Sequence, residues 1–497
     1  MKIFQISLLI LVLFPLIGAH AQHIFSEQKM EYKKPFNAHD LHRCFDVGEE
    51  EFVMLMEGKK HIFTLGRYDK YLFSKWEKKL EFLDKESVPQ IFLKGDSAII
   101  INYTYSKKEK KASLRTQIFD TKNGEELFAQ MFDPAIDLDP AFVPVLSLSE
   151  DKSMLLLYHY ATSHEGEPRT TLTLFRIGNS TPLKDVYVNP DMFSSSVTTE
   201  VHINNQGDIL LAVADPVSFK ANVFFWGFEN THPIILESNY FFERPPDKIG
   251  KIEIQQTGSH EYFLAFSALI EKELIGFTAM LADLETNNIS NSKTVNFHQQ
   301  EISDLYSDYI TTSDKQKKKQ LKIPSNLEDF TLLTSYSISS GDVILIFEKL
   351  ETPVLYQQSL SGINLEWYPE IKEDKYYLGE DIALICISPE GIIRWKKVIQ
   401  KIQYSKENAL SLSYLVQMKD NIMQMLIWDS VKNGKFFLLG INTLDGNEQE
   451  KIELIANKSY DYTKNYSCFI DENFILLCGI SPGNSQNRKI LLIEMDR

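Results

Sequence analysis

The chain has 497 residues, of which 68 are acidic and 52 basic, and its formal charge at pH 7 is −16. Phosphate binding needs a concentrated basic surface, so this balance argues against a nucleic-acid partner. Hydrophobic residues make up 43% of the chain and aromatic residues 12%. This composition is rich enough for a large core and excludes wholesale disorder.

The first 21 residues have the pattern of a secretory signal peptide. Lys2 provides a positive start, residues 6–17 are apolar, and Ala19 and Ala21 are the small residues that a signal peptidase reads. The apolar stretch spans about 12 residues, where a membrane span needs about 20, so an uncleaved anchor is the weaker interpretation. Cleavage after Ala21 predicts an exported protein, periplasmic or extracellular, without a membrane span.

A unit of roughly 53 residues recurs along the rest of the chain, which is typical of β-propellers. Each copy contains a nearly continuous apolar run, which predicts an inner strand covered on both faces. A second run alternates, as at residues 114–118 and 171–174, and predicts a strand with one wetter face. Turns containing Gly follow, as at residues 120–124, 388–391 and 442–446. The apolar runs occupy residues 96–101, 152–157, 208–213, 342–347, 421–426 and 473–478.

The count of alternating runs predicts the number of blades. They begin near residues 62, 114, 171, 223, 277, 383, 436 and 489. The gap from 277 to 383 is double, so it contains either two insertions or a degenerate blade. We therefore predict an all-β fold with a single β-propeller over residues 22–497 and about eight blades, with seven or nine as alternatives.

The last unit ends directly after its third strand, which leaves a place for a fourth. Propellers avoid an open sheet edge by pairing strands from the two termini. The segment 24–36 lies upstream of the first complete unit. We predict that this segment fills the vacant place.

Two stretches depart from the repeat. Residues 298–329 are polar with helical apolar spacing at Ile302, Leu305, Tyr306 and Tyr309, and predict a surface excursion. Residues 351–381 form an aromatic insertion between two strands of one blade, and loops on a rigid sheet often carry binding sites. Exposed Tyr and Trp rings stack on sugars and peptides. The candidate ligand-binding residues of this insertion are Tyr356, Trp367, Tyr368, Tyr376 and Tyr377. The alternative is that these rings only cap the blade.

Four cysteines do not form a disulfide framework in a protein of this size. Cys386 lies in an apolar run and is expected to pack as a small hydrophobic residue. Cys468 and Cys478 flank a predicted hairpin turn. A bond between these two requires that they fall opposite each other, and Cys44 would remain unpaired.

No sequence motif supports a catalytic residue, a metal site or a cofactor. The Gly-x-Ser-x-Gly pattern around Ser481 connects two predicted strands and no His follows it, unlike a nucleophile elbow. Asp133, Asp137 and Asp139 lack the Gly of a calcium loop. His39 and His42 lack an identifiable third metal ligand. His159 and His164 are interpreted as ordinary polar residues beside a turn.

Residues 381–400 resemble the strand–turn–strand motif of exported bacterial propeller-like repeat proteins, in which an acidic residue and Gly precede a Trp. In this stretch the motif residues are Glu390, Gly391 and Trp395. The resemblance extends to the general class of quinoprotein-type and Kelch-like propellers, and it implies a scaffold and no particular chemistry. Trp395 itself is expected to pack between blades.

The leading hypothesis is an exported scaffold that binds a protein or glycan through loops on one face, without catalysis. One competing hypothesis is a carbohydrate-active enzyme with carboxylates gathered in the central channel. Another is a structural subunit of an envelope assembly. The sequence does not define an oligomeric state.

Overall fold

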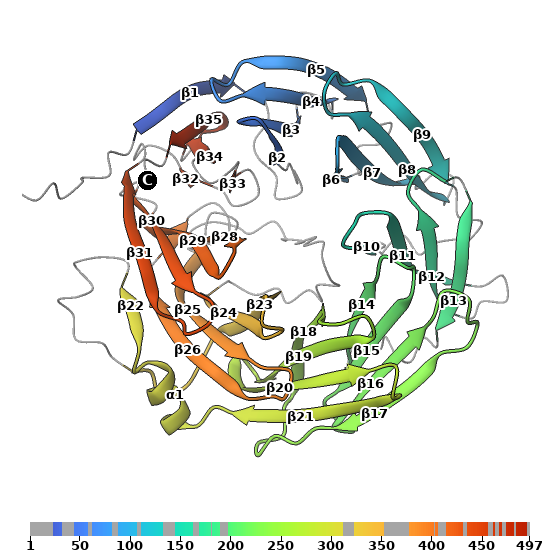
Figure 1. The fold of residues 1–497 in the computed structure, drawn as a ribbon, viewed down its shortest axis with the longest axis vertical. Coiled ribbons are helices and arrows are strands. Elements are labelled where there is room, and N and C mark those ends of the chain that lie inside the picture. Colours follow the sequence, from blue (N-terminus) through green and yellow to red (C-terminus); the bar gives the residue numbers. More distant parts are fainter. Residues whose placement is uncertain are drawn as a thin grey trace, which may run out of the picture.

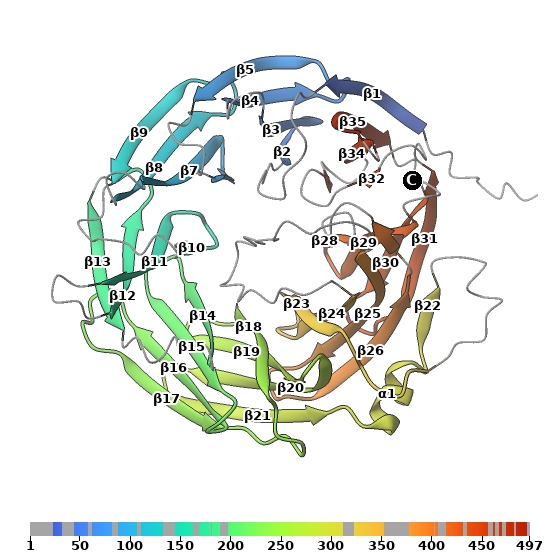
Figure 2. The same ribbon diagram turned by 180° about the vertical axis from the view of Figure 1, so that it is seen from behind.

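The computed structural model describes most of the chain between residues 23 and 494. The described residues are 23–31, 44–57, 62–81, 88–106, 111–132, 145–162, 168–179, 181–188, 197–311, 323–351, 377–401, 403–405, 414–430, 435–455, 461–462, 467–469, 474–481 and 484–494. Their strands form eight sheets arranged in a ring (Figures 1 and 2). The prediction of an all-β fold with a single β-propeller is confirmed.

Seven of the sheets are built from consecutive strands. Sheet 1 comprises β2 (Cys44–Gly48), β3 (Glu51–Glu57), β4 (Ile62–Asp69) and β5 (Ser74–Glu81). Sheet 2 comprises β6 (Val88–Lys94), β7 (Ser97–Ser106), β8 (Lys111–Asp120) and β9 (Glu126–Phe132). Sheet 3 comprises β10 (Val145–Leu148), β11 (Met154–Thr162), β12 (Pro168–Arg176) and β13 (Pro182–Val188). Sheet 4 comprises β14 (Thr198–Ile203), β15 (Ile209–Asp215), β16 (Lys220–Trp226) and β17 (Ile234–Asn239).

The remaining consecutive sheets include the two departures from the repeat. Sheet 5 comprises β18 (Lys248–Gln256), β19 (Glu261–Ile270), β20 (Glu273–Asp283) and β21 (Asn288–Asn296). Helix α1 (Gln299–Leu305) follows sheet 5. Sheet 6 comprises β22 (Tyr309–Thr311), β23 (Phe330–Ser337), β24 (Val343–Glu351), β25 (Tyr377–Ile387), β26 (Ile393–Gln400) and β27 (Gln403–Ser405). Sheet 7 comprises β28 (Tyr414–Lys419), β29 (Ile422–Ser430), β30 (Lys435–Asn442) and β31 (Glu448–Ile455).

The eighth sheet joins the two ends of the chain, as the sequence predicts. It comprises β32 (Asp461–Tyr462), β33 (Cys468–Phe469), β34 (Phe474–Ser481), β35 (Asn484–Glu494) and β1 (His23–Glu31). Strand β1 pairs antiparallel with β35, from His23 opposite Glu494 to Glu31 opposite Asn487. In Figure 1 the dark blue strand therefore lies beside the red one, and the ring is closed.

The core of the ring consists of apolar layers between successive sheets. In β7, Ile100 contacts the layer shared with sheet 1, whereas Ile99 and Ile101 contact the layer shared with sheet 3. All three side chains are buried, because each sheet is covered on both faces. This arrangement explains the continuous apolar runs. The prediction of a wetter face for residues 171–174 is wrong, because Thr171 and Thr173 are each only 2% exposed between neighbouring sheets.

The eight predicted starting points all fall within the third strand of a sheet, counted outward from the centre. The double gap is explained by two insertions, because the described residues in it add no further sheet. One insertion differs from the prediction of a surface excursion. Ile302, Leu305 and Tyr306 of the α1 region are buried against sheets 5 and 6. After them, β22 adds a parallel strand to β26.

Tryptophans of the outer strands connect neighbouring sheets. Trp76 Nε1 donates a hydrogen bond to Thr121 O of the next sheet at 2.9 Å, and Trp395 Nε1 donates to Thr443 O at 2.8 Å. Each indole also covers a turn glycine, since a Cβ at Gly446 would lie 2.7 Å from Trp395 Cε3. The predicted packing of Trp395 between blades is confirmed.

We expect Gly446→Ala to cost more stability than Gly341→Ala. Both glycines have positive φ, +72° and +83°, which costs an L-residue about 1–2 kcal/mol. Only at Gly446 does the new methyl group collide with an indole, and such overpacking adds about 1–3 kcal/mol. Urea denaturation of the two variants measures the difference. Equal losses of unfolding free energy would show that Trp395 yields to the methyl group without cost.

Candidate ligand-binding site

The two ends of the ring carry connections of different length. Because each sheet runs antiparallel from its innermost to its outermost strand, the first and third hairpins of sheets 1 to 7 and the first hairpin of sheet 8 lie at one end, which we call the turn face. The longest turn-face connection, 227–233, has seven residues. The second hairpin and the link to the next sheet lie at the opposite end, which we call the loop face. Segments 297–329 and 352–376 both belong to the loop face.

The predicted aromatic site lies mostly outside the described residues. Tyr356, Trp367, Tyr368 and Tyr376 fall in segment 352–376, which the structure does not describe. Tyr377 is the first residue of β25, and its backbone lies opposite Ser405 of β27. The predicted insertion 351–381 is therefore too long at its end, since residues 377–381 continue a strand.

The described strands nevertheless define where segment 352–376 is attached. Glu351, the last residue of β24, lies opposite Leu378 of β25. Strand β27 pairs with residues 377–379 on the other side of β25. The segment therefore leaves and re-enters sheet 6 at one point of the loop face, between strands that hold its ends together.

A buried ion pair lies beside this attachment point. Lys401 Nζ contacts Glu348 Oε1, and both side chains are 0% exposed. Lys401 Nζ also donates a hydrogen bond to Gln403 Oε1 at 2.7 Å. The pair joins β24 to the stretch between β26 and β27. Burial, together with the nearby carboxylates of Glu348 and Glu253, raises the pKa of Tyr414 well above its ordinary value.

A second group of charged residues lies along the loop-face side of sheet 6. Lys349 contacts Glu380 in an ion pair, and Tyr306 Oη donates a hydrogen bond to Asp381 Oδ2 at 2.8 Å. Burial raises the pKa of Asp381 to about 6, although the hydrogen bond from Tyr306 lowers it, and Glu380 raises it further. Asp381 thus attaches the α1 region to the strand at which segment 352–376 ends.

We expect Asp381→Asn to make the protein more stable than wild type at neutral pH and not at pH 4. The pKa of Asp381 is higher in the folded protein than in the unfolded chain, so the protonated carboxyl group stabilises the fold. This stabilisation is complete below about pH 4 and is lost as the pH rises through 6. The full loss is on the order of 2–3 kcal/mol, and Asn still accepts the Tyr306 hydrogen bond. The measurement is the difference in unfolding free energy between the two proteins across this range. Burial lowers the pKa of His202 to about 4, so His202 also titrates in this range. Its effect on the unfolding free energy is the same in both proteins and cancels in the difference. A difference independent of pH would contradict the assignment.

Carboxylates also gather between the inner strands of sheets 4 to 6. Lys251 Nζ lies 2.5 Å from Glu253 Oε1 and donates to Leu333 O, and Ser335 Oγ donates to Glu253 Oε2 at 2.8 Å. Burial opposes charge on Lys251, but Glu253 and Glu200 outweigh it and raise its pKa. Lys251 therefore balances the charge of Glu253, and its bond to Leu333 together with the Ser335–Glu253 bond joins sheets 5 and 6. The sequence analysis did not predict these buried carboxylates. Glu200 and Glu348 each lie next to an apolar strand run, and that position could have indicated a buried charge.

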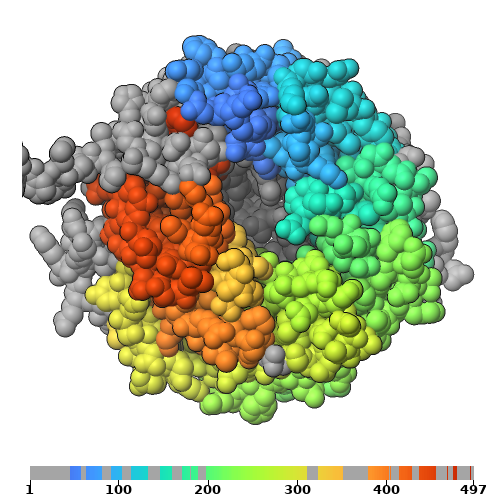
Figure 3. Space-filling view, viewed as in Figure 1, coloured from blue at the N-terminus to red at the C-terminus, as the bar shows by residue number. Residues whose placement is uncertain are grey.

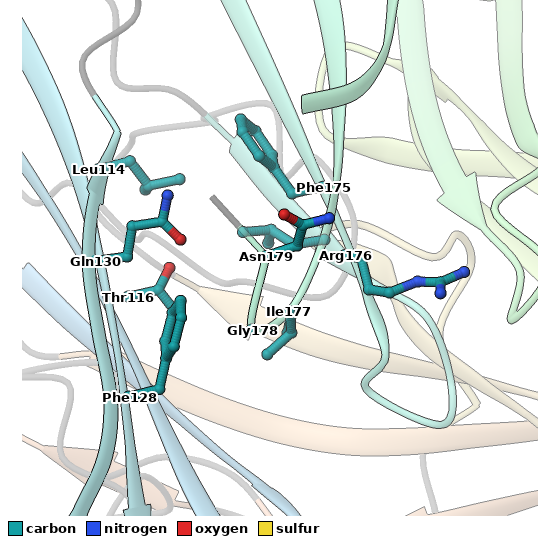
Figure 4. Close-up of a pocket in the computed structure, with 10 residues that line it drawn as sticks. Leu114, Thr116, Phe128, Gln130, Phe175, Arg176, Ile177, Gly178 and Asn179 are labelled. Carbon is teal, nitrogen blue, oxygen red and sulfur yellow. The ribbon is translucent and has the colours of Figure 1, made fainter. Parts of the chain in front are cut away.

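The best-defined cavity among the described residues lies between sheets 2 and 3 (Figure 4). Its volume is about 20 Å³, enough for one water molecule. Phe128 and Gln130 of β9 face it from one side, and Ile177 and Gly178 from the other. A cavity of this size does not hold a sugar or a peptide side chain. In the space-filling view the larger opening is the central one, which the inner strands surround (Figure 3).

The structure also shows the positions of the cysteines considered in the sequence analysis. Cys386 is buried, as expected. Cys468 lies opposite Leu476, and Cys478 opposite Ile490, so the condition for a bond between the two cysteines is not met.

Ser481 ends β34 and pairs with Asn484 of β35, which places the Gly-x-Ser-x-Gly pattern between two strands. The segments containing His39, His42, Asp133, Asp137, Asp139 and His164 lie outside the described residues. The described part of the chain contains no group of residues suited to a metal ion, and no helix there has the length and apolarity to cross a membrane.

Comparison with known proteins finds similarity in architecture only, at low sequence identity and low TM-score. No protein-family model and no curated protein matches the sequence. A crystal structure of BamB from Moraxella catarrhalis has 8% identity and a TM-score of 0.40, covering 94% of this chain and all of that one. The WD40 domain of SCAP from fission yeast has 9% identity and a TM-score of 0.38, with 95% and 97% covered. A quinohemoprotein alcohol dehydrogenase from Pseudomonas putida has 7% identity and a TM-score of 0.43, with 96% and 76% covered. The chain is a β-propeller, and its resemblance to known propeller-like repeat proteins is architectural.

Proposed function

We propose that this protein is an exported, non-enzymatic β-propeller scaffold, with each of the eight sheets as one blade, that binds a protein or glycan at its loop face. The observation that carries the proposal is the difference between the two faces. All connections longer than seven residues between the strands lie at the loop face, and segment 352–376 is the longest interval between two successive strands. Long loops on a rigid scaffold are the usual place for binding residues.

The proposed contact residues are Tyr356, Trp367, Tyr368, Tyr376 and Tyr377. The two strands that flank their segment are paired with each other, and the buried Glu348–Lys401 pair joins β24 to the stretch after β26. A rigid attachment reduces the conformational entropy that a binding segment loses when it meets its ligand. Broad aromatic faces then supply stacking area for a sugar or a peptide.

A carbohydrate-active enzyme is the second candidate, because Glu200, Glu253 and Glu348 come from three different sheets and are buried toward the centre of the ring. The ion pairs of Glu253 with Lys251 and of Glu348 with Lys401 favour a structural role for these groups instead. A general acid requires a carboxyl group that can reach a substrate, and Glu348 is fully buried. Turnover of a glycoside by the purified protein at enzymatic rates would overturn the scaffold proposal.

The test is a glycan and peptide array probed with the protein that starts at residue 22. One variant replaces Trp367, Tyr368, Tyr376 and Tyr377 by Ala. A control variant replaces Tyr71 and Phe73, exposed aromatic residues of the turn face, by Ala. We expect the unsubstituted protein and the control variant to bind a ligand on the array, and the variant with four Ala substitutions to lose this binding. Binding that survives in the first variant would move the site elsewhere, and absence of any binding would favour a subunit of an envelope assembly.

A further inference from the structure

The outermost strands of the sheets differ in how they protect their open edges. Charged residues on an edge strand discourage pairing with another chain. Strand β5 carries five charged residues, β31 carries four, and β13 carries Lys184 and Asp185. Strands β17 and β21 each carry one charge within the strand, Glu237 and Lys293. Strand β9 has only Glu126, at its first residue.

Apart from Glu126, the described exposed side chains of β9 are apolar. Leu127 is 55% exposed and Met131 is 51% exposed, and Ala129 between them is exposed as well. Within the described residues β9 pairs with β8 alone and forms the outer edge of sheet 2 (Figure 1). A strand of this kind offers unpaired backbone groups beside an uncharged stripe, which is the geometry for strand addition.

The pattern of β9 is complementary to itself. Leu127 and Met131 lie at equal distances in sequence from Ala129, so antiparallel pairing of two copies about Ala129 places Leu127 of each copy opposite Met131 of the other. In the same register Glu126 falls opposite position 132, which is Phe in the sequence, so within the bounds of β9 no carboxylate faces another. A two-fold interface requires such self-complementarity.

We propose that two copies of this chain associate through antiparallel pairing of their β9 strands, which joins sheet 2 of each ring into one continuous sheet. The contact is a single short strand on each side, so we expect a weak dimer with a Kd on the order of tens of micromolar. The formal charge of −16 on each copy opposes the approach of two rings. Salt screens this repulsion, and the dimer is therefore expected to strengthen at high ionic strength.

Two matched double variants test the register. Leu127→Lys/Met131→Lys places like charges opposite each other across the two-fold axis and is expected to abolish the dimer. Leu127→Lys/Met131→Glu changes the same exposed positions but places opposite charges there, and is expected to keep the dimer, most clearly at low salt. Tyr187→Lys, on the outer strand of sheet 3, is the control for a rim charge that should have no effect.

The readout is sedimentation velocity of the purified protein across the micromolar range at low and high salt. A wild-type protein that remains monomeric would overturn the proposal. The same conclusion follows if the Lys/Lys variant still dimerises, or if the Lys/Glu variant loses the dimer together with the Lys/Lys variant. Circular dichroism of each variant checks that the fold is retained, since all three positions are exposed.

Discussion

A chain that begins at residue 32, without β1, is expected to lose a large part of its stability. Strand β1 supplies the outer strand of the eighth sheet and connects the first and last parts of the chain. Its removal exposes the whole edge of β35 and releases the link that joins sheet 8 to sheet 1. Domains of ordinary stability have about 5–15 kcal/mol in total, so the loss of this closure is expected to lower the melting temperature sharply and to promote aggregation.

The matched control for this deletion is a chain that begins at residue 22, which removes the predicted signal peptide and keeps β1. We expect it to retain full stability. A synthetic peptide covering residues 22–36, added to the chain that lacks β1, should restore part of the lost melting temperature by occupying the free edge. If the chain without β1 unfolds at the same temperature as the control, the β1–β35 pairing does not close the ring.

The second large effect is expected at the buried ion pair of sheet 6. Lys401→Met leaves the Glu348 carboxylate buried without its cation, and breaking such a pair costs about 3–5 kcal/mol. Lys220→Met is the control, because Lys220 pairs with Glu237 at the surface, where the two side chains are 43% and 50% exposed. Loss of an exposed pair costs about 0–1 kcal/mol. Chemical denaturation of both variants measures the contrast.

The double variant Lys401→Met/Glu348→Gln separates the effect of charge from the effect of packing. Replacing Glu348 by Gln removes the buried charge, so the double variant is expected to be more stable than Lys401→Met alone. If Glu348→Gln gives no recovery, the loss in Lys401→Met comes from the altered packing. Equal losses for Lys401→Met and Lys220→Met would show that the Glu348 carboxylate reaches water.

The candidate site was accessible to sequence reasoning only in part. The composition of residues 351–381 indicated an aromatic insertion, and the strand bounds confirm that segment 352–376 lies between two adjacent strands of one sheet. The pairing of Glu348 with Lys401 and the contact of Tyr306 with Asp381 were not predicted. The two partners are 53 positions apart in the first pair and 75 in the second. A local sequence pattern does not indicate which distant side chain a polar residue will contact.

The all-β class, the repeat and the closing strand could be predicted from the amino-acid sequence, because each prediction rests on a pattern of neighbouring residues. An apolar run predicts a strand covered on both faces, a Gly or Asn in a turn predicts a hairpin, and an open sheet edge predicts a pairing partner. The tertiary structure decided which side chains meet between neighbouring sheets. Thr171 and Thr173 are buried for this reason, and Trp76 and Trp395 reach the turn of the following sheet. The ring geometry also decided that the long connections share one face, because every sheet runs in the same direction from the centre to the rim.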